Sequence, residues 1–477
     1  METSVLLRVS GLRHFLQFLI QFGSSVVVAR TLTPEEIGTF SVAMAVIAIA
    51  TAVRGGSVGL YLVQKRDLQR THIGSALGLT MAISFTLGAV IALMGDVVAD
   101  FYGKATIRDI LWLTSISFFL APIQAVAMGL MSRELQLGRH ALAGLIASAS
   151  GAAVTVTLAL LGHGPISLAW GLLSNSTVGA ILFCALAPKE VWTLPRFFKD
   201  WREIWSITSW ALLSEVINQF GSRVSELIIG KTLSLADAAL IERSSTLPRM
   251  LWRHLMPPVL GILVPIVAYE MRNQENLQHL TIRRMRYFGC VFVPILTGMS
   301  SQSEHLLLGI YGGQWTAAVE PAAWMCLSAA ITGQFVVISP IMSALGKTRD
   351  AFFLTIASLV VRLMVLSVTA TISILAVAMG SMVGATVSSM LTVYFGNRLG
   401  IIRYESLVTA TKPGIVAGIV IYLVGIGLDY GLTTYTSLGH LPILLIVICV
   451  LGVTLLGLLR FLEPDLIRYG RKVLGWN

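Results

Sequence analysis

The stretch VVVARTLTPEEIGTF, residues 26–40, lies where one apolar run ends and the next begins. A basic residue closes the first run, a Thr-Pro turn with two glutamates follows, and a second run opens at Ile37. This pattern predicts a helix end, a turn and a helix start. It returns in ELIIGKTLSLADAALI, residues 226–241, at an offset of 201 residues. The matched pairs are Arg30 with Lys231, Thr33 with Ser234, and Glu36 with Asp237. The chain therefore contains an internal repeat.

The composition is typical of a membrane protein. Of the 477 residues, 55% are hydrophobic and 12% are charged, and the mean hydropathy is +0.80, whereas soluble domains carry about 25% charged residues. The first apolar run contains Gln17 and Gln21 and is not followed by a small-residue cleavage site, so we expect a membrane helix there and no removable signal peptide. The four cysteines lie inside apolar runs without CxxC pairs or histidine clusters, which favours packing roles over disulfides or metal sites.

The apolar runs are long enough to cross a bilayer. A helix of about 20 residues spans about 30 Å of hydrocarbon. Fourteen such runs are found, at 12–30, 38–62, 73–94, 108–131, 140–162, 165–187, 206–231, 236–269, 285–311, 318–343, 351–372, 374–398, 412–430 and 440–460. The run at 236–269 contains four prolines and is too long for one straight helix, so we expect it to be kinked or partly outside the bilayer. The predicted fold is an all-α polytopic membrane protein with about 14 transmembrane helices.

The net charge of +10 follows from membrane topology. Most of the 34 lysines and arginines fall in segments predicted on one side of the membrane. The other side holds only Arg30, Lys104, Arg108 and Lys231. Basic residues collect on the cytoplasmic side of membrane proteins. We therefore expect both termini in the cytoplasm, and the basic charge requires no nucleic-acid partner.

The repeat predicts the domain organisation. Arg30 and Lys231 close the first and seventh predicted helices on the same side, so each begins an equivalent six-helix unit with the same orientation. Transporters use parallel repeats of this kind, with substrate held at the interface of the halves near the midplane. We expect an N-terminal lobe at 1–200, a C-terminal lobe at 201–400, and two additional helices with a cytoplasmic tail at 401–477.

The first helix of each predicted lobe carries a polar stripe. Gln17 and Gln21 share one helical face of the run at 12–30, because they lie four residues apart. The stripe of the run at 206–231 consists of Glu215, Asn218, Gln219, Ser222 and Glu226, with Arg223 alongside. Gln17, Gln21, Asn218 and Gln219 are candidates for binding substrate. Hydrogen bonds between helices explain the two glutamines of the first stripe equally well.

Six arginines lie within predicted helices: Arg54, Arg223, Arg243, Arg249, Arg253 and Arg362. A charged side chain at the bilayer centre costs about 2.5–3.5 kcal/mol on insertion scales, so each should face protein or water. Arg54 precedes two glycines, which let a ligand approach the backbone, and Arg253 lies beside the repeat-equivalent position. Guanidinium groups bind phosphate bidentately. Arg54, Arg223 and Arg253 are therefore candidate anchors for a phosphate-bearing substrate.

These charged residues also have structural interpretations. Arg223 and Glu226 lie at i and i+3 and could form a local ion pair. Arg253 could extend its side chain to the cytoplasmic interface, and backbone carbonyl groups could satisfy Arg54. Glu215 and Glu226 are candidates for coupling to a proton or sodium gradient, because an acid beside an arginine that moves between states could load and release a proton.

Several stretches occur in an order that resembles a known family. They are VARTLTPEEIGTFSVAMAV (28–46), GLYLVQKRDL (59–68), MSRELQLGRHAL (131–142), GIYGGQWTAAVEPAAWM (309–325) and SALGKTRDAF (343–352). Their order is similar to that of the polysaccharide transporter family of Wzx-type flippases, within the multidrug/oligosaccharidyl-lipid/polysaccharide exporter superfamily. The resemblance runs from about residue 12 to about residue 400. It implies alternating access and movement of a polyprenyl-pyrophosphate-linked oligosaccharide to the periplasmic leaflet of a bacterial inner membrane, for exopolysaccharide, capsule or O-antigen assembly.

The sequence favours transport over catalysis. It contains no GxxxxGK[ST] or HExxH motif, so we expect neither an enzyme nor a cofactor. The expected partners are the lipid-linked oligosaccharide, membrane lipid, and a polysaccharide polymerase with its chain-length machinery. Two alternatives remain open. An ion-coupled drug/cation antiporter of the same fold would have embedded acids that predominate over cations, and a membrane polysaccharide polymerase would extend glycan chains.

Overall fold

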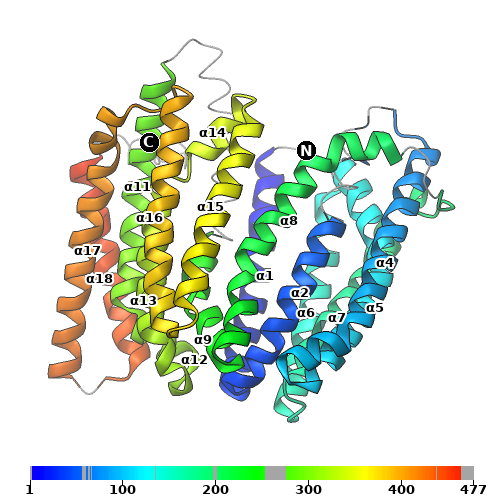
Figure 1. Cartoon of the computed structure of the whole chain (residues 1–477), viewed down its shortest axis with the longest axis horizontal. Coiled ribbons are helices and arrows are strands. Elements are labelled where there is room, and N and C mark those ends of the chain that lie inside the picture. Colours follow the sequence, from blue (N-terminus) through cyan, green and yellow to red (C-terminus); the bar gives the residue numbers. More distant parts are fainter. Residues whose placement is uncertain are drawn as a thin grey trace. The chain divides into compact units, whose positions relative to one another are not determined.

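The computed structural model describes residues 3–55, 61–62, 65, 67–134, 136–196, 201–252, 276–436 and 438–463. All regular secondary structure in these residues is helical (Figure 1). The contacts divide the chain into two compact units, Met1–Ala239 and Leu240–Asn477. The lobe boundary near residue 200 that the repeat suggests stays a prediction. The repeat concerns the equivalence of two halves of the sequence, whereas these units are defined by contacts.

The first unit is built from long helices that pack in pairs. α4 packs on α5, α6 on α7, α5 on α7, α1 on α6, and α2 on α8. The elements are α1 (Thr3–Thr31), α2 (Pro34–Gly55), α4 (Arg70–Tyr102), α5 (Ala105–Arg133), α6 (Leu137–Leu160), α7 (Ile166–Leu186), η1 (Lys189–Val191) and α8 (Trp201–Thr232). Between α4 and α5, Gly103 has a φ of +70°, a conformation that favours glycine and reverses the chain in two residues. α9 (Leu235–Ser244) crosses the division between the units.

The second unit contains a seam between two helices distant in sequence. α17 (Leu407–Tyr435) lies along α11 (Leu277–Ser301). The other elements are α12 (Ser303–Tyr311), η2 (Gly313–Ala318), α13 (Val319–Gly333), α14 (Ile338–Ala344), α15 (Thr348–Thr369), α16 (Ile374–Arg398), η3 (Tyr404–Ser406) and α18 (His440–Leu462). α13 and α15 both pack on α16, and α18 packs on α12 and α17.

The α11–α17 seam is made by small residues and by hydrogen bonds to backbone. A Cβ at Gly414 would lie 2.6 Å from the carbonyl carbon of Gly289, so only glycine fits. Thr297 Oγ1 donates to the carbonyl oxygen of Gly418 at 2.9 Å, and Gln302 Nε2 donates to that of Gly425 at 3.0 Å. Close backbone approach and side-chain bonds to carbonyl groups hold helices together where lipid provides no hydrophobic drive. The two helices outside the repeat are thus firmly joined to it.

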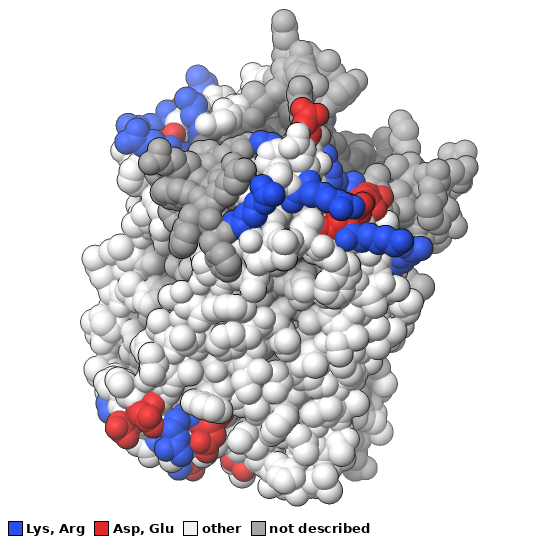
Figure 2. All heavy atoms as spheres, turned by 90° about the vertical axis from the view of Figure 1, so that its right-hand side faces the viewer, with Lys and Arg blue, Asp and Glu red and all other residues white. Residues whose placement is uncertain are grey.

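The chain is a multi-pass membrane protein. Ten helices of the described residues are long and apolar enough to cross a membrane, and the shorter apolar stretch Phe15–Thr31 belongs to α1. On the face shown in Figure 2, lysines, arginines and acids gather at the two ends and leave an uncharged band between them. Such a band matches the hydrocarbon layer. The all-α fold predicted from the apolar runs is confirmed.

Three predicted runs differ from the helices found. The run at 318–343 is divided into α13, which ends at Gly333, and α14, which starts at Ile338. The run at 285–311 is divided, because α11 ends at Ser301 and α12 starts at Ser303. Gln302 lies at the break, where its side chain bonds to α17. The proline-rich run at 236–269 begins as α9, turns at residue 245 and is helical again over 246–252. The remainder of that run lies outside the described residues.

The repeated turns have the same local structure. In the first turn, Glu36 N donates to Thr33 Oγ1 at 3.3 Å, and Thr33 N donates to Glu36 Oε2 at 2.8 Å. In the second turn, Asp237 N donates to Ser234 Oγ at 3.0 Å, and Ser234 Oγ donates to Asp237 Oδ2 at 2.6 Å. A hydroxyl residue three positions before an acid caps the start of a helix in this way. The sequence echo is therefore a pair of matched helix starts.

Candidate functional site

The site is positioned by the way α2 and α8 meet at one end. A Cβ at Gly38 would overlap the carbonyl oxygen of Leu235, and a Cβ at Gly230 would lie 2.8 Å from Val42 Cγ2. Tyr102 Oη donates to the carbonyl oxygen of Leu227 at 2.8 Å. These contacts hold α2, α4 and the last turns of α8 tightly together.

Ionic contacts reinforce the same end of the first unit. Lys104 Nζ lies 2.6 Å from Glu35 Oε1. Lys231 Nζ donates to the carbonyl oxygen of Phe101 and lies 4.4 Å from the centre of its ring. Lys104 and Lys231, two of the four basic residues predicted on the outer side, thus both lie at this end. The contacts therefore couple α8 to α2 and α4, and α2 to the start of α5, at this end of the first unit.

Arg54 lies far from this end of α2. It is twelve residues beyond Val42, and Asn218 is twelve residues before Gly230 on α8. At 1.5 Å per residue, both lie about 18 Å along their helices from the Val42–Gly230 contact. Arg54 and the middle of α8 are therefore at comparable depth in the first unit.

Arg54 is partly buried in the last turn of α2. Its guanidinium carbon lies 5.0 Å from the centre of the Phe118 ring of α5, a cation–π contact. Among the residues that the structure describes, the guanidinium has neither a hydrogen bond nor an ion pair. A ring face stabilises a cation but uses none of its five N–H donors. Those donors can therefore bind an anionic group.

The middle of α8 presents polar side chains outward. Glu215, Asn218 and Ser222 are exposed, and Gln219 Nε2 donates to Glu215 Oε1 at 3.0 Å. These residues follow one face over about two turns, as the sequence stripe predicts. Elsewhere, the exposed side chains in the middle of α15 and α16 include Val360, Met364, Val383 and Val387. A carboxylate and amides cannot face hydrocarbon cheaply, so this face of α8 requires water or a polar ligand.

Arg223 and Glu226 are brought together on α8. Arg223 Nη1 lies 3.7 Å from Glu226 Oε1, and the Glu226 side chain is 2% exposed. This is the local ion pair that the i, i+3 spacing allows. Of the two acids predicted to couple transport to an ion gradient, Glu226 is buried beside a cation, and Glu215 is open to solvent.

The polar residues of α1 are divided between two environments. A Cβ at Gly144 of α6 would lie 3.2 Å from Gln17 Nε2, so Gln17 is directed at a neighbouring helix. Gln21 is exposed. Gln17 thus fits the helix-packing interpretation, while Gln21 remains available to a ligand. Arg253 lies outside the described residues.

Other predicted cations have mainly structural surroundings. Arg243 of α9 lies with its guanidinium carbon 4.5 Å from the ring centre of Tyr311 and 4.9 Å from that of Trp315. Arg249 donates to the carbonyl oxygen of Glu242 at 3.1 Å. Arg362 is exposed near the middle of α15. The selection of Arg54 over these residues stays a prediction.

The sequence analysis missed two groups of residues. Phe118 has no local signal, since an aromatic residue in an apolar helix is ordinary. Asp429 and His305 did carry a signal, because each interrupts an apolar run, and the structure brings them together with His440. An inventory of every titratable residue in the predicted spans would have found both.

Comparison with known sequences gives a consistent family. The sequence model of a family described as "Polysaccharide biosynthesis protein" matches residues 27–320. The succinoglycan biosynthesis transport protein ExoT of Rhizobium meliloti is 22% identical over 397 residues, covering 82% of this chain and 77% of that protein. The lipopolysaccharide biosynthesis protein WzxC of Escherichia coli is 19% identical over 309 residues, covering 63% of this chain and 61% of that protein.

Solved structures show the same fold. The lipid II flippase MurJ, in an inward closed conformation, is similar with a TM-score of 0.75 at 13% identity, over 98% of this chain and 100% of that one. A multidrug resistance MATE family transporter in an inward-facing conformation gives a TM-score of 0.61 at 14% identity, over 80% of this chain and 94% of that one. At these identities the likeness concerns the fold.

Proposed function

Because the chain belongs to the polysaccharide biosynthesis protein family, we propose that it is a flippase for a polyprenyl-pyrophosphate-linked oligosaccharide. It moves the lipid-linked sugar from the cytoplasmic to the periplasmic leaflet of a bacterial inner membrane, for exopolysaccharide, capsule or O-antigen assembly. The transported lipid changes sides without any bond being made or broken. A polysaccharide polymerase with its chain-length machinery is the expected recipient.

The observation that carries the proposal is the Arg54 guanidinium. It has one aromatic contact and, among the described residues, no acid or hydrogen-bond acceptor. A pyrophosphate supplies several oxygens, and a guanidinium binds two of them through parallel N–H groups. Arg54 is thus suited to hold the charged part of the substrate.

The exposed face of α8 suits the sugar. Its carboxylate, amides and hydroxyl provide donors and acceptors at the depth of Arg54. Sugars and a pyrophosphate cross hydrocarbon at high cost, whereas a prenyl chain remains in the lipid, so a polar face open sideways removes most of the barrier. The tight contact of α2 with the end of α8 lies about 18 Å from Arg54 along the helix, and the proposed substrate reaches Arg54 from the opposite, cytoplasmic end.

The central experiment is reconstitution. Purified protein in vesicles should move a radiolabelled polyprenyl-pyrophosphate oligosaccharide between leaflets, and the Arg54→Ala protein should not. A drug/cation antiporter would instead exchange an organic cation for protons and leave the labelled lipid in place. Extension of glycan chains by the purified protein would support the polymerase alternative.

The proposed topology has both termini in the cytoplasm and both repeated turns in the periplasm. Single cysteines are introduced one at a time, in a background in which Cys184, Cys290, Cys326 and Cys449 have been replaced. Cysteines at Thr33 and Ser234 should react with an impermeant maleimide in intact cells. A cysteine at the exposed Asp67 is the matched control and should react only after the membrane is opened. Labelling of either turn only in opened cells would contradict the parallel repeat.

We also propose that Glu215 and Glu226 set the response to a proton or sodium gradient. Support comes from the Arg223–Glu226 pair, because a change in its distance between states would alter the proton affinity of the acid. Glu215→Gln and Glu226→Gln proteins should flip lipid with reduced dependence on an imposed gradient. Unchanged dependence in both variants would exclude this role while leaving the flippase proposal intact.

A further inference from the structure

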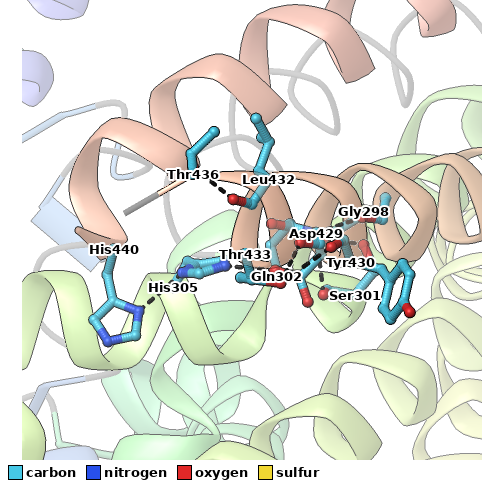
Figure 3. Close-up of polar contacts among 11 residues, drawn as sticks. Gly298, Ser301, Gln302, His305, Asp429, Tyr430, Leu432, Thr433, Thr436 and His440 are labelled. Atoms are coloured by element: carbon cyan, nitrogen blue, oxygen red, sulfur yellow. Dashed lines mark hydrogen bonds and ion pairs between the residues drawn. The ribbon is translucent and has the colours of Figure 1, made fainter. Parts of the chain in front are cut away.

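Three titratable side chains from three helices form a line in the second unit (Figure 3). His305 of α12 is the central member, and its side chain is 3% exposed. Its Nε2 lies 2.5 Å from Asp429 Oδ1 of α17. Its Nδ1 lies 2.9 Å from Nδ1 of His440, the first residue of α18. Both nitrogens of a buried imidazole are therefore in use.

The distance between the two rings limits the number of protons they hold. Two Nδ1 atoms 2.9 Å apart need one proton between them, because two lone pairs or two N–H groups facing each other repel. With both rings neutral, His440 Nδ1–H donates to His305 Nδ1, and His305 Nε2–H donates to Asp429. One added proton makes the pair a single cation, which the carboxylate compensates.

A second added proton has no such place. Both rings would then carry N–H groups at Nδ1, pointing at each other, and two positive charges would share one carboxylate. Like charges at this separation repel strongly where water is scarce. Since each ring belongs to a different helix, the repulsion acts between α12 and α18.

The first turn of α18 packs closely on α12 beside the histidine pair. A Cβ at Gly309 of α12 would lie 3.3 Å from His440 Cβ, so the first turn of α18 lies in close contact with α12 at this glycine. The Asp429 side chain is 34% exposed, which gives protons a path from water to the buried ring. The line is thus both tightly packed and open to titration.

The other titratable groups of the surrounding helices are less directly involved. Glu304 of α12, Glu320 of α13, and Tyr430 and Tyr435 of α17 are exposed. Tyr311 of α12 is buried against Arg243. In the part of the chain that the structure describes, none of these five side chains is hydrogen-bonded to either imidazole. Asp429 is therefore the acid that controls the charge of the pair.

We propose that His305 and His440 form a proton-binding latch that fastens α18 to α12. The latch is closed while the pair carries at most one added proton, and a second proton opens it. Acidification therefore releases the first turn of α18. Under the proposed topology α12 ends at the periplasmic side, so the latch responds to external pH.

The test measures the distance between the two helices as a function of pH. Nitroxide labels are placed at Ala317, exposed in η2 beside α12, and at Leu445, exposed on α18, in full-length protein without native cysteines. The protein is held in detergent, where pH is the same on both sides. The measurement therefore depends neither on topology nor on flipping, and its failure would leave the proposed function untouched.

The native pair should give one distance population at about pH 8 and a second, longer one that grows to a major fraction by about pH 5. His440→Gln, which keeps a donor but cannot take up a proton, should show no such growth. Asp429→Asn removes the charge that stabilises the protonated pair, so the opening should move to lower pH. Equal distributions at both pH values in the native pair, or the same change in His440→Gln, would overturn the latch. If His440→Gln does not fold, the direction of the Asp429→Asn shift decides.

Discussion

Arg54 in the first unit and Arg243 in the second are two guanidinium groups with opposite surroundings. Arg243 is 6% exposed and lies against two buried rings, Tyr311 and Trp315. Arg54 is only partly buried and has one ring, Phe118, on one side. Both are cations in a membrane protein, yet one is enclosed by its own chain, and the other has no hydrogen bond or ion pair among the residues that the structure describes. Enclosure, and not charge alone, separates a packing arginine from a candidate anchor.

The largest effect is expected from the enclosed arginine. Arg243→Ala removes two cation–π contacts and leaves a cavity between α9, α12 and η2, so the free energy of unfolding should fall by about 3 kcal/mol or more. Membrane abundance and thermal stability should drop together. The transport rate per folded molecule should remain near the native value. Normal stability with lost transport would reverse the assignment of the two arginines.

An intermediate effect is expected at the open arginine. Arg54→Ala removes hydrogen bonds to a charged ligand, worth about 1.5–3 kcal/mol, so transport should fall roughly 10- to 100-fold at unchanged abundance. Arg54→Lys is the matched control and should be partly impaired, because an ammonium cannot bind two oxygens in parallel. Complementation of a flippase-null strain, scored beside membrane abundance, measures both. An abundant, fully active Arg54→Ala protein would show that this residue does not hold the substrate.

The smallest effect is expected from the ring beside Arg54. Phe118→Leu keeps an apolar side chain but removes the cation–π contact, worth about 0.5–1 kcal/mol at a partly exposed site. Because the Phe118 side chain is 1% exposed, its truncation also costs packing, so transport is measured per folded molecule and should fall about 2- to 5-fold. In the Arg54→Ala background the same substitution should have no further effect on transport. An equal additional loss there would mean that Phe118 acts independently of the arginine.

Local sequence patterns were sufficient for the all-α fold and for the two matched helix starts. Thr33 with Glu36 and Ser234 with Asp237 form the expected helix caps, because such caps depend on residues three positions apart. The polar face of α8 also follows from helical spacing alone. The Arg223–Glu226 pair is of the same kind, since both partners lie on one turn.

Features that depend on distant residues could not be predicted. The break between α11 and α12 falls at Gln302, which bonds to Gly425, 123 residues further along the chain. No proline or glycine marks it in the sequence. The ring beside Arg54 comes from another helix, and the line from His305 to Asp429 and His440 joins three. In each of these three features the sequence shows a polar residue within an apolar run. Which residue it contacts depends on tertiary packing and cannot be read from local sequence.

The seam between α11 and α17 has a consequence for how the protein is made. α11 is synthesised more than a hundred residues before α17, so Thr297, Gln302 and the surface at Gly289 are inserted before their partners exist. Until α17 arrives, Thr297 and Gln302 have only local acceptors, the carbonyl groups of Pro294 and Ser301, and the close-packing surface at Gly289 is uncovered, a state that quality-control proteases and insertion factors could recognise. A shortened chain ending after α16 would be arrested in that state. Chimeras that exchange the last two helices between relatives must therefore exchange the facing residues of α11 with them.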